Sequence, residues 1–534
     1  MKNNCSENTN DRGESIMMLK NNKNKQLVIN MVANLLSTVV RFCVSFFLTP
    51  FIIKRVGVEA NGFVSLAGNF TGYATIVTMA LNSMAGRFIT LSIHQEDYDE
   101  TNKYMSSVFA ANLLSSAVLT VPAVLLVINM NNWFNVSAAI VSDVKILWAF
   151  LFADFFYGNI VSVFSVAAFS QNRLDIQSGT GIILSLVRAG IIVAAYMLFD
   201  TKVWYMGATT FLCTLLTSAV NIYCTKHFLP FAKISKKYFD FKKIKELLSA
   251  GVWNSVSKVS NILSEGLDLL VANLFIGDTA MGIISLAKHM PAYILSFTGG
   301  ISSIFAPQLT INYAKNNMEE IKNDLISSIK ILGFITCIPL SIMYAYGDVF
   351  FGLWAPTQDA KLLQTIAIVA SLEFPLVLPL EPLWNIFTTT NKVKQSSLYL
   401  VINSAATIII EFILLHFATT EYQKIMIIVG VSTAFSIVRA LTFLPLYGAK
   451  CLNFKRTIFY KPAFKNLIAV IILTVISLFI KKIFPLNSWF ALIAASCLTA
   501  AISFVINYFA LLSKHERDIL KSKIFRKKAV ENDT

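Results

Sequence analysis

The stretch VGVEANGFVSLA at Val56–Ala67 returns, 220 positions later and without a gap, as IGDTAMGIISLA at Ile276–Ala287. A period of this length is far beyond that of solenoid repeats, so it indicates two homologous lobes within one chain. We expect two lobes of this kind to enclose a cleft. The identical pairs are Gly57/Gly277, Ala60/Ala280, Gly62/Gly282, Ser65/Ser285, Leu66/Leu286 and Ala67/Ala287.

The composition predicts a polytopic membrane protein, because 55% of the residues are hydrophobic, only 14% are charged and the mean hydropathy is +0.63. Many apolar runs reach the roughly 20 residues that a helix needs to cross a bilayer. Helices are expected because lipid offers backbone groups no partners, and the runs lack the alternation of barrel strands. The expected fold class is therefore all-α, with fourteen spans at 27–52, 62–84, 105–129, 146–169, 177–199, 205–225, 247–277, 280–306, 325–346, 362–388, 396–418, 424–447, 463–484 and 489–512.

The duplication covers six predicted spans, an even number, so both copies should face the same way about an axis along the membrane normal. The last two spans have no counterpart. Within 362–388, Pro375, Pro379 and Pro382 predict a kinked or broken helix. The predicted organisation is a disordered tail at 1–26, a first lobe at 27–225, a basic loop at 226–246, a second lobe at 247–447, two appended spans within 463–512 and a basic tail at 513–534.

Lys and Arg concentrate in alternate connections between the spans, which places both termini in the cytoplasm by the positive-inside rule. The net charge of +15 is largely this topological signal. A nucleic-acid partner is not expected, because the basic loops sit where they would touch anionic membrane lipids.

No cofactor or metal is expected. The seven cysteines show no ligand spacing and no disulfide framework. The chain also lacks a Walker-type phosphate loop, so we do not expect it to use ATP in that way.

Polar residues inside the spans carry the functional prediction, because a charge near the bilayer centre costs about 2.5–3.5 kcal/mol and generally faces a partner or a wet cavity. The span 247–277 carries five polar residues on one helical face. The matching face of the first span includes Asn34 and Arg41. We interpret both stripes as cavity walls; the alternative is that they only hydrogen-bond to neighbouring helices. The five residues are Asn254, Lys258, Asn261, Glu265 and Asp268.

Depth separates the cations from the acids. Counted from the inner ends, four cations lie between the inner surface and the midplane, whereas Glu265 and Asp268 lie toward the outer half. A cavity that is basic near the cytoplasm would attract an anionic head group, because guanidinium and ammonium groups suit phosphate oxygens. The four cations are Arg41, Lys258, Arg188 and Arg439.

Three further acids have two interpretations each. Asp154 lies at nearly the depth of Arg188, so a structural ion pair and a substrate role for the arginine both stay open. Glu373 and Glu411 lack an obvious cation, which makes them candidates for proton coupling together with Glu265 and Asp268 on the earlier stripe. Protonated carboxyls bonded to a carbonyl are the alternative.

The pattern formed by Asn34, Arg41, LTPFIIKRVG at Leu48–Gly57, the following NGF and MAGRFIT at Met84–Thr90 resembles the Wzx-type flippases of polysaccharide and O-antigen repeat units. These belong to the multidrug, oligosaccharidyl-lipid and polysaccharide exporter superfamily, whose multidrug branch has a similar fold. The resemblance implies a substrate such as an undecaprenyl diphosphate-linked oligosaccharide, moved from the inner to the outer leaflet of a bacterial cytoplasmic membrane. It also implies an ion gradient as energy source, and as partners a polysaccharide polymerase and glycosyltransferases. It supports Arg41 most directly.

The sequence therefore predicts a flippase that works by alternating access and makes or breaks no bond. One alternative is a multidrug or organic-cation antiporter of the same superfamily, in which Glu265, Asp268 and Glu373 would bind the cation. The other is an integral membrane glycan polymerase or ligase, although such enzymes usually carry a larger outer loop than this chain offers.

Overall fold

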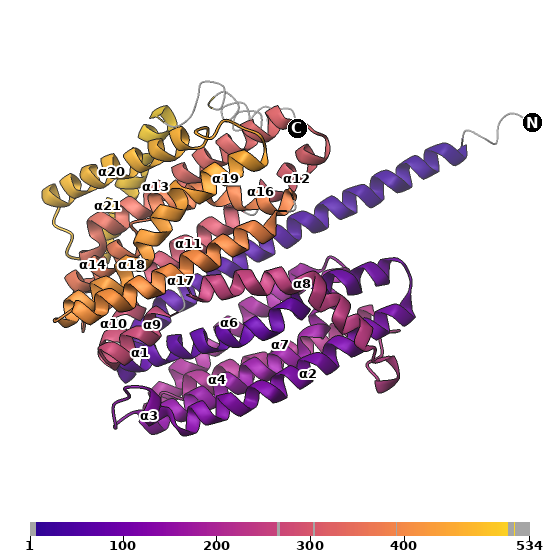
Figure 1. Cartoon of the computed structure of the whole chain (residues 1–534), viewed down its shortest axis with the longest axis horizontal. Helices are drawn as coiled ribbons and strands as arrows, with labels where there is room; N and C mark the ends of the chain where they lie inside the picture. Colours follow the sequence, from indigo (N-terminus) through magenta and orange to yellow (C-terminus); the bar gives the residue numbers. More distant parts are fainter. Residues whose placement is uncertain (1–6, 264–266, 303–304, 391, 511–516, 518–534) are drawn as a thin grey trace, which may run out of the picture. The chain divides into compact units, whose positions relative to one another are not determined.

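The computed structural model describes residues 7–263, 267–302, 305–390, 392–510 and 517. Within these residues every regular element is a helix and none is a strand (Figure 1). The all-α prediction is therefore confirmed.

The predicted number of fourteen spans is not confirmed. Among the described residues, ten helices are long and apolar enough to cross a bilayer, or eleven if α14 (Ala360–Ser371) and the following Phe374–Thr389 form one span. That pair is bent by 42°, so the break expected in 362–388 is present. The predicted spans 247–277 and 280–306 do not pass. The span 280–306 is divided into short helices, whereas the first part of 247–277 falls in a helix at Phe241–Asn261 that is 21 residues long but too polar.

The chain divides into two compact units, Met1–Val259 and Ser260–Thr534. α1 begins at Glu7, so the tail predicted as disordered is helical from that residue and continuous with the first span. Unit 1 contains α1 (Glu7–His94), α2 (Tyr98–Ile128), α3 (Met130–Trp133), α4 (Val141–Val161), η1 (Ser162–Ser165), α5 (Val166–Ser170), α6 (Leu174–Leu198), α7 (Tyr205–Phe228), η2 (Lys236–Tyr238) and most of α8 (Phe241–Asn261).

Unit 2 begins near the end of α8 and holds the second copy of the repeat with two appended helices. Its elements are α9 (Asp268–Phe275), α10 (Asp278–Ala287), α11 (His289–Ser302), α12 (Ala306–Ala314), α13 (Met318–Trp354), α14 (Ala360–Ser371), α15 (Phe374–Leu380), η5 (Glu381–Leu383), α16 (Trp384–Thr389), α17 (Val393–Phe417), α18 (Glu421–Leu441), α19 (Phe443–Cys451), α20 (Tyr460–Ile483) and α21 (Trp489–Ala510).

The duplicated glycines break the helices at equivalent places in the two units. Gly57 has a φ of 89° inside α1, and Gly277 has a φ of 145° between α9 and α10. L-residues with a side chain rarely adopt such angles, so glycine is needed at both breaks. A Cβ on Gly57 would also lie 2.8 Å from the Glu59 carboxylate. The repeat read from the sequence therefore has a matching backbone geometry.

A second matching turn lies 39 positions after the glycines in both copies. Glu96 and Asn316 have φ angles of 58° and 55°. The next residue in each copy caps the following helix: the Asp97 side chain accepts from the backbone N–H of residue 100 before α2, and the Asn317 side chain accepts from that of residue 320 before α13. Side-chain oxygens at this position satisfy backbone donors that the first turn leaves open.

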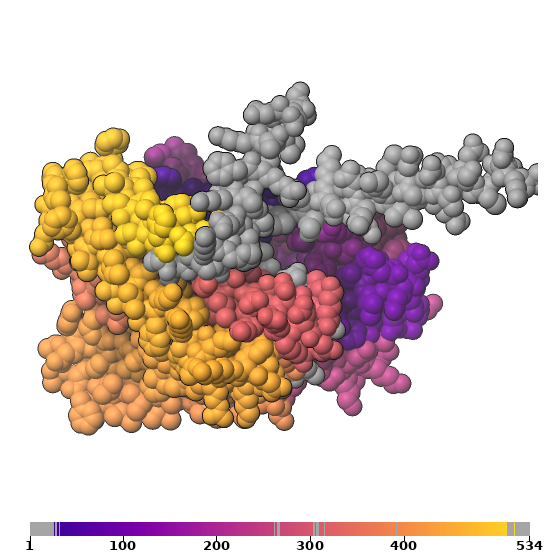
Figure 2. Space-filling model, turned by 90° about the horizontal axis from the view of Figure 1, so that it is seen from above, coloured from indigo at the N-terminus to yellow at the C-terminus, as the bar shows by residue number. Residues whose placement is uncertain are grey.

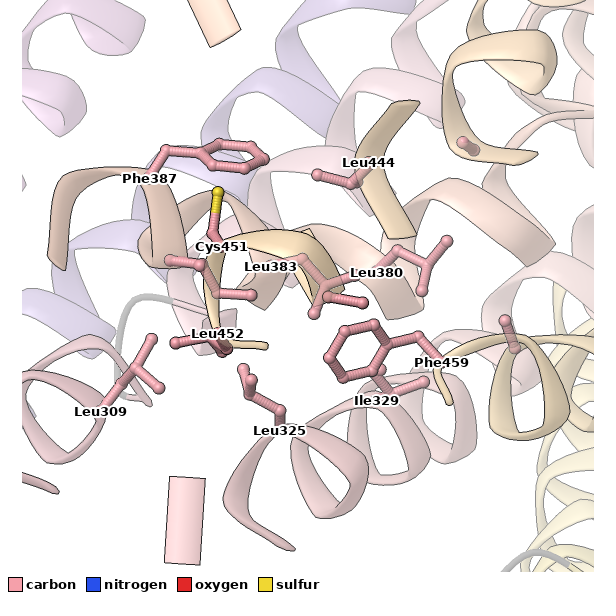
Figure 3. Packing of buried hydrophobic residues seen from close by; sticks show 14 of the residues in the cluster. Leu309, Leu325, Ile329, Leu380, Leu383, Phe387, Leu444, Cys451, Leu452 and Phe459 are labelled. Carbon is pink, nitrogen blue, oxygen red and sulfur yellow. The ribbon is translucent and has the colours of Figure 1, made fainter. Parts of the chain in front are cut away.

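Equivalent residues also anchor the apolar interiors. Ile89 and Met105 are buried in the cluster of unit 1, and their counterparts Leu309 and Leu325 are buried in the cluster of unit 2 (Figure 3). Both clusters join the helix before the capped turn to the helix after it.

The appended helices α20 and α21 pack on α13. Asn466 of α20 donates to the Ile329 carbonyl at 3.0 Å, and the Tyr346 hydroxyl shares a 2.8 Å hydrogen bond with Thr499 of α21. Their outer faces stay apolar and exposed, as at Val475 and Phe490, and the yellow C-terminal helices form part of the visible surface in Figure 2. Such faces suit contact with lipid.

The basic loop before α8 is fixed to α2. Ser107 exchanges hydrogen bonds with the backbone of Asp240, at 2.9 and 3.1 Å, and Asn102 bonds to the backbone of Lys233 at 2.7 Å. Lys243 pairs with Glu100. Burial lowers the pKa of Lys243, but the hydrogen bond that it donates to Glu100 and the neighbouring acidic groups outweigh burial, so the net pKa is raised. These contacts set where α8 begins.

Candidate functional site

Three of the predicted cavity cations have no carboxylate partner among the described residues. Arg41 is exposed on α1, and Lys258 is half-buried near the end of α8. Arg439 on α18 donates only to the Ser436 hydroxyl, at 3.3 Å. Cations held in apolar helices without a counter-charge are costly unless they meet water or an anion. These three side chains can therefore receive an anionic group.

The polar stripe of α8 is partly engaged by α1. Asn254 donates to the Ser83 hydroxyl at 3.0 Å, and Ser255 donates to the Ile76 carbonyl at 3.0 Å. A Cβ on Gly251 would lie 1.9 Å from the Ala80 carbonyl oxygen, so the two helices touch through their backbones. Asn254 thus makes the helix-to-helix hydrogen bond that was the alternative to a cavity role.

The other asparagines of the predicted stripes are less constrained. Asn34 is exposed on α1, where its carbonyl accepts from Thr38 at 2.9 Å. Asn261 ends α8, but its side chain lies outside the described part of the structure. Glu265 lies outside the described residues altogether.

Asp154 of α4 and Arg188 of α6 attract each other electrostatically, but the charged atoms of the two side chains lie too far apart for a direct ion pair. Asp154 Oδ1 and Arg188 Nε are both buried without a hydrogen-bond partner. Asp154 lines a hollow of about 370 Å³ together with Thr214 and Asn159. No direct contact therefore decides between a structural and a functional role for Arg188.

An asparagine cluster crosses the interior of unit 1 next to this hollow. Asn112 of α2 is fully buried and donates to Asn82 at 3.0 Å, to the Asn159 carbonyl at 3.0 Å and to Ser162 at 3.1 Å. Asn159 in turn donates to Ser116 at 3.0 Å. The sequence analysis missed this cluster. The signal available was the presence of uncharged amides in three neighbouring apolar spans.

Unit 2 contains a buried ionic cluster between α9, α10, α17 and α18. Asp268 is 3% exposed, pairs with Lys288 and accepts from the Ser432 hydroxyl at 3.5 Å. Glu411 is 2% exposed, and its electrostatic neighbours are Asp268 and Lys288. Glu411 Oε1 has no hydrogen-bond partner among the described residues. With both acids ionised, the cluster would carry one net negative charge, which one monovalent cation can neutralise.

Lys288 belongs to this cluster, although the sequence analysis did not assign it to any site. It follows Asp268 by 20 residues, across the break at Gly277, so helical spacing could not connect the two. Glu373 lies elsewhere along the chain, at the bend before α15, where it interacts electrostatically with Tyr344. The Tyr344 hydroxyl donates to the Ser371 carbonyl at 2.7 Å.

A comparison with protein families gives a match over residues 26–310 to the family described as polysaccharide biosynthesis protein. The match covers more than half of the chain. The protein belongs to this family. A relative from Bacillus subtilis (strain 168), the uncharacterized membrane protein EpsK, is 26% identical over 507 residues, which cover 95% of this chain and 100% of the relative.

Solved structures show the same fold. The lipid II flippase MurJ in an inward closed conformation is 14% identical, covers 94% of this chain and 100% of its own, and gives a TM-score of 0.60. An inward-facing multidrug resistance transporter of the MATE family and the MOP superfamily is 16% identical, covers 78% and 98%, and gives 0.59. The family resemblance drawn from the sequence is confirmed, and the chain is a multi-pass membrane protein with a transporter fold.

Proposed function

We propose that this protein flips a lipid-linked oligosaccharide, such as one on undecaprenyl diphosphate, from the inner to the outer leaflet of the bacterial cytoplasmic membrane by alternating access. Membership of the polysaccharide biosynthesis family supports the substrate class. The observation that carries the proposal is the set of cations in apolar helices, Arg41, Lys258 and Arg439, that have no carboxylate partner among the described residues. Such groups match the charge of a diphosphate.

We further propose that the cluster of Asp268, Lys288 and Glu411 couples transport to an ion gradient. Uptake of one proton or one monovalent cation at Glu411 would neutralise the cluster, and its release would restore the charge. One elementary charge moved through a potential of 100 mV contributes about 2.3 kcal/mol. That energy is enough to shift two states by a factor of about fifty.

The antiporter alternative has less support. It needs Asp268 to face a bulky organic cation, whereas Asp268 is 3% exposed and already paired with Lys288.

The test is the outer-leaflet accessibility of lipid-linked sugar in intact cells that carry Arg41→Ala and Lys258→Ala together. We expect accessibility to fall by about tenfold or more, since a hydrogen bond to a charged group contributes about 1.5–3 kcal/mol. Arg55→Ala is the matched control, because Arg55 is an exposed arginine on the same helix, with its guanidinium 5.6 Å from the centre of the Phe51 ring. Unchanged accessibility in the double variant would remove these cations from the mechanism. Dye resistance without a glycan defect would favour the antiporter.

A further inference from the structure

Unit 1 contains a second, larger hollow. None of the residues proposed above to bind the substrate or to couple ions lines it. Its volume is about 800 Å³, within the range of about 300–1,000 Å³ typical of small-molecule sites. The second half of α1 forms one wall, and α2, η1, α5 and the first turn of α6 form the others. The polar and small residues that matter here are Asn82, Gly86, Arg87, Thr90, His94 and Gln177.

The hollow is electrostatically one-sided. Arg87 and His94, seven residues apart on α1, both line it, and no Asp or Glu is among its lining residues. Arg87 has no ion pair with any described carboxylate, and its side chain is exposed. The sequence analysis did not assign Arg87 to any site.

Uncharged polar groups complete the lining. The Thr90 hydroxyl lies one turn from Arg87, and it is buried with no hydrogen-bond partner in the part of the chain that the structure describes. His94 Nδ1 donates to the Thr90 carbonyl at 2.9 Å, so Nε2 of the neutral ring is an acceptor. The Gln177 amide is held by the Ser165 carbonyl at 3.1 Å. A buried hydroxyl beside an unpaired guanidinium fits a ligand rich in acceptor oxygens.

Open space beside the cation is provided by Gly86. A Cβ built on this residue would meet no atom within 4 Å. The residue is helical, so glycine is not required here by the backbone angles. A larger side chain at this position would enter the hollow, which offers a way to block it without changing its charge.

The second copy of the repeat lacks these groups. The positions equivalent to Gly86, Arg87 and His94 in unit 2 are Ala306, Pro307 and Ala314. The shared fold therefore does not require a cation at this place, so the charge of the hollow is a property of unit 1 alone.

We propose that this hollow is a binding site for a phosphate or diphosphate ester, with Arg87 as the bidentate ligand and the Thr90 hydroxyl as a further donor. The ligand chemistry has two sources, the diphosphate of a lipid-linked sugar and the phosphate head group of an anionic membrane lipid. The first source rests on the proposed function; the anion site itself does not. If the ligand is the lipid-linked sugar, the hollow binds its diphosphate before the substrate reaches the cations of the predicted cavity.

The experiment is titration calorimetry of the purified full-length protein with inorganic pyrophosphate. We expect Arg87→Gln and Gly86→Leu each to weaken binding by about tenfold or more. Gly190→Leu and Arg55→Gln are matched controls and should bind as the wild type does, since Gly190 on α6 also has open space around a Cβ and does not line the hollow. Binding is compared only between variants whose unfolding temperature equals that of the wild type. No binding by the wild type, or equal binding by Arg87→Gln, would overturn the proposal.

The same titration in nanodiscs identifies the source. Weaker pyrophosphate binding in discs that contain phosphatidylglycerol than in pure phosphatidylcholine supports a lipid head group as occupant. Equal binding in both supports a site reserved for the diphosphate. The amount of glycan at the outer leaflet of Arg87→Gln cells separates this proposal from the proposed flippase function. If the variant loses pyrophosphate binding but the glycan is normal, the hollow binds an anion and takes no part in transport.

Discussion

Replacing Lys288 with Met should destabilise unit 2 more than any surface charge change, because it leaves the Asp268 carboxylate buried without its cation. Removing one partner of a buried pair costs about 3–5 kcal/mol. The side chains of Lys288 and Asp268 are 30% and 4% exposed, so water can reach the lysine side and we expect the lower end, about 3 kcal/mol. The double variant Lys288→Met with Asp268→Asn should recover most of this loss, since the Asp268 carboxylate is removed together with its cation and Glu411 is the one acid left in the cluster.

The measurement is reversible unfolding in mixed micelles, followed for the wild type, both single variants and the double variant as a thermodynamic cycle. Lys103→Met is the matched control, because it removes an ion pair whose side chains, Lys103 and Asp99, are 37% and 62% exposed. We expect that control to change the free energy of unfolding by less than about 1 kcal/mol. The reasoning is refuted if Lys288→Met is as mild as the control, or if the double variant is no more stable than Lys288→Met alone.

Three further substitutions test the packing. Asn112→Leu removes three donated hydrogen bonds, each worth about 0.6 kcal/mol inside membrane proteins, so the free energy of unfolding should fall by about 2 kcal/mol; a loss below about 0.5 kcal/mol would contradict the cluster. Gly251→Ala should cost about 1–3 kcal/mol because its Cβ meets the Ala80 carbonyl, whereas Gly299→Ala, with open space, should unfold at the wild-type temperature. Gly57→Ala should lower stability by about 1–2 kcal/mol through its φ of 89°, and an unchanged midpoint would show that the break can relax.

The duplication was readable from the sequence because it rests on residues that the backbone requires. Gly57 and Gly277 recur since both helix breaks need angles that other residues avoid. The prolines after Glu373 likewise predicted the bend of 42° before α15. Helix breaks and bends of this kind depend on the residue type at single positions, so they can be predicted from one sequence.

The span count and the ionic cluster were harder to predict, because both depend on which helices touch. Hydropathy alone joined α8 to α9 and α10 to α11, although each pair is interrupted. Asp268, Lys288 and Glu411 come from three helices, and a single sequence gives no register between them. The cations Arg41 and Lys258 could be named as candidates because a charge in an apolar run is conspicuous by itself, and their role stays a prediction.

The asparagines of unit 1 have instructive counterparts. Where the first copy has Asn82, Asn112 and Asn159, of which the last two are buried, the other has Ser302, Leu332 and Leu378, all three buried. The same scaffold thus tolerates amide and aliphatic side chains at equivalent interior positions. The two copies therefore place their buried polar groups differently: the first in the asparagine cluster, and the second in the cluster of Asp268, Lys288 and Glu411.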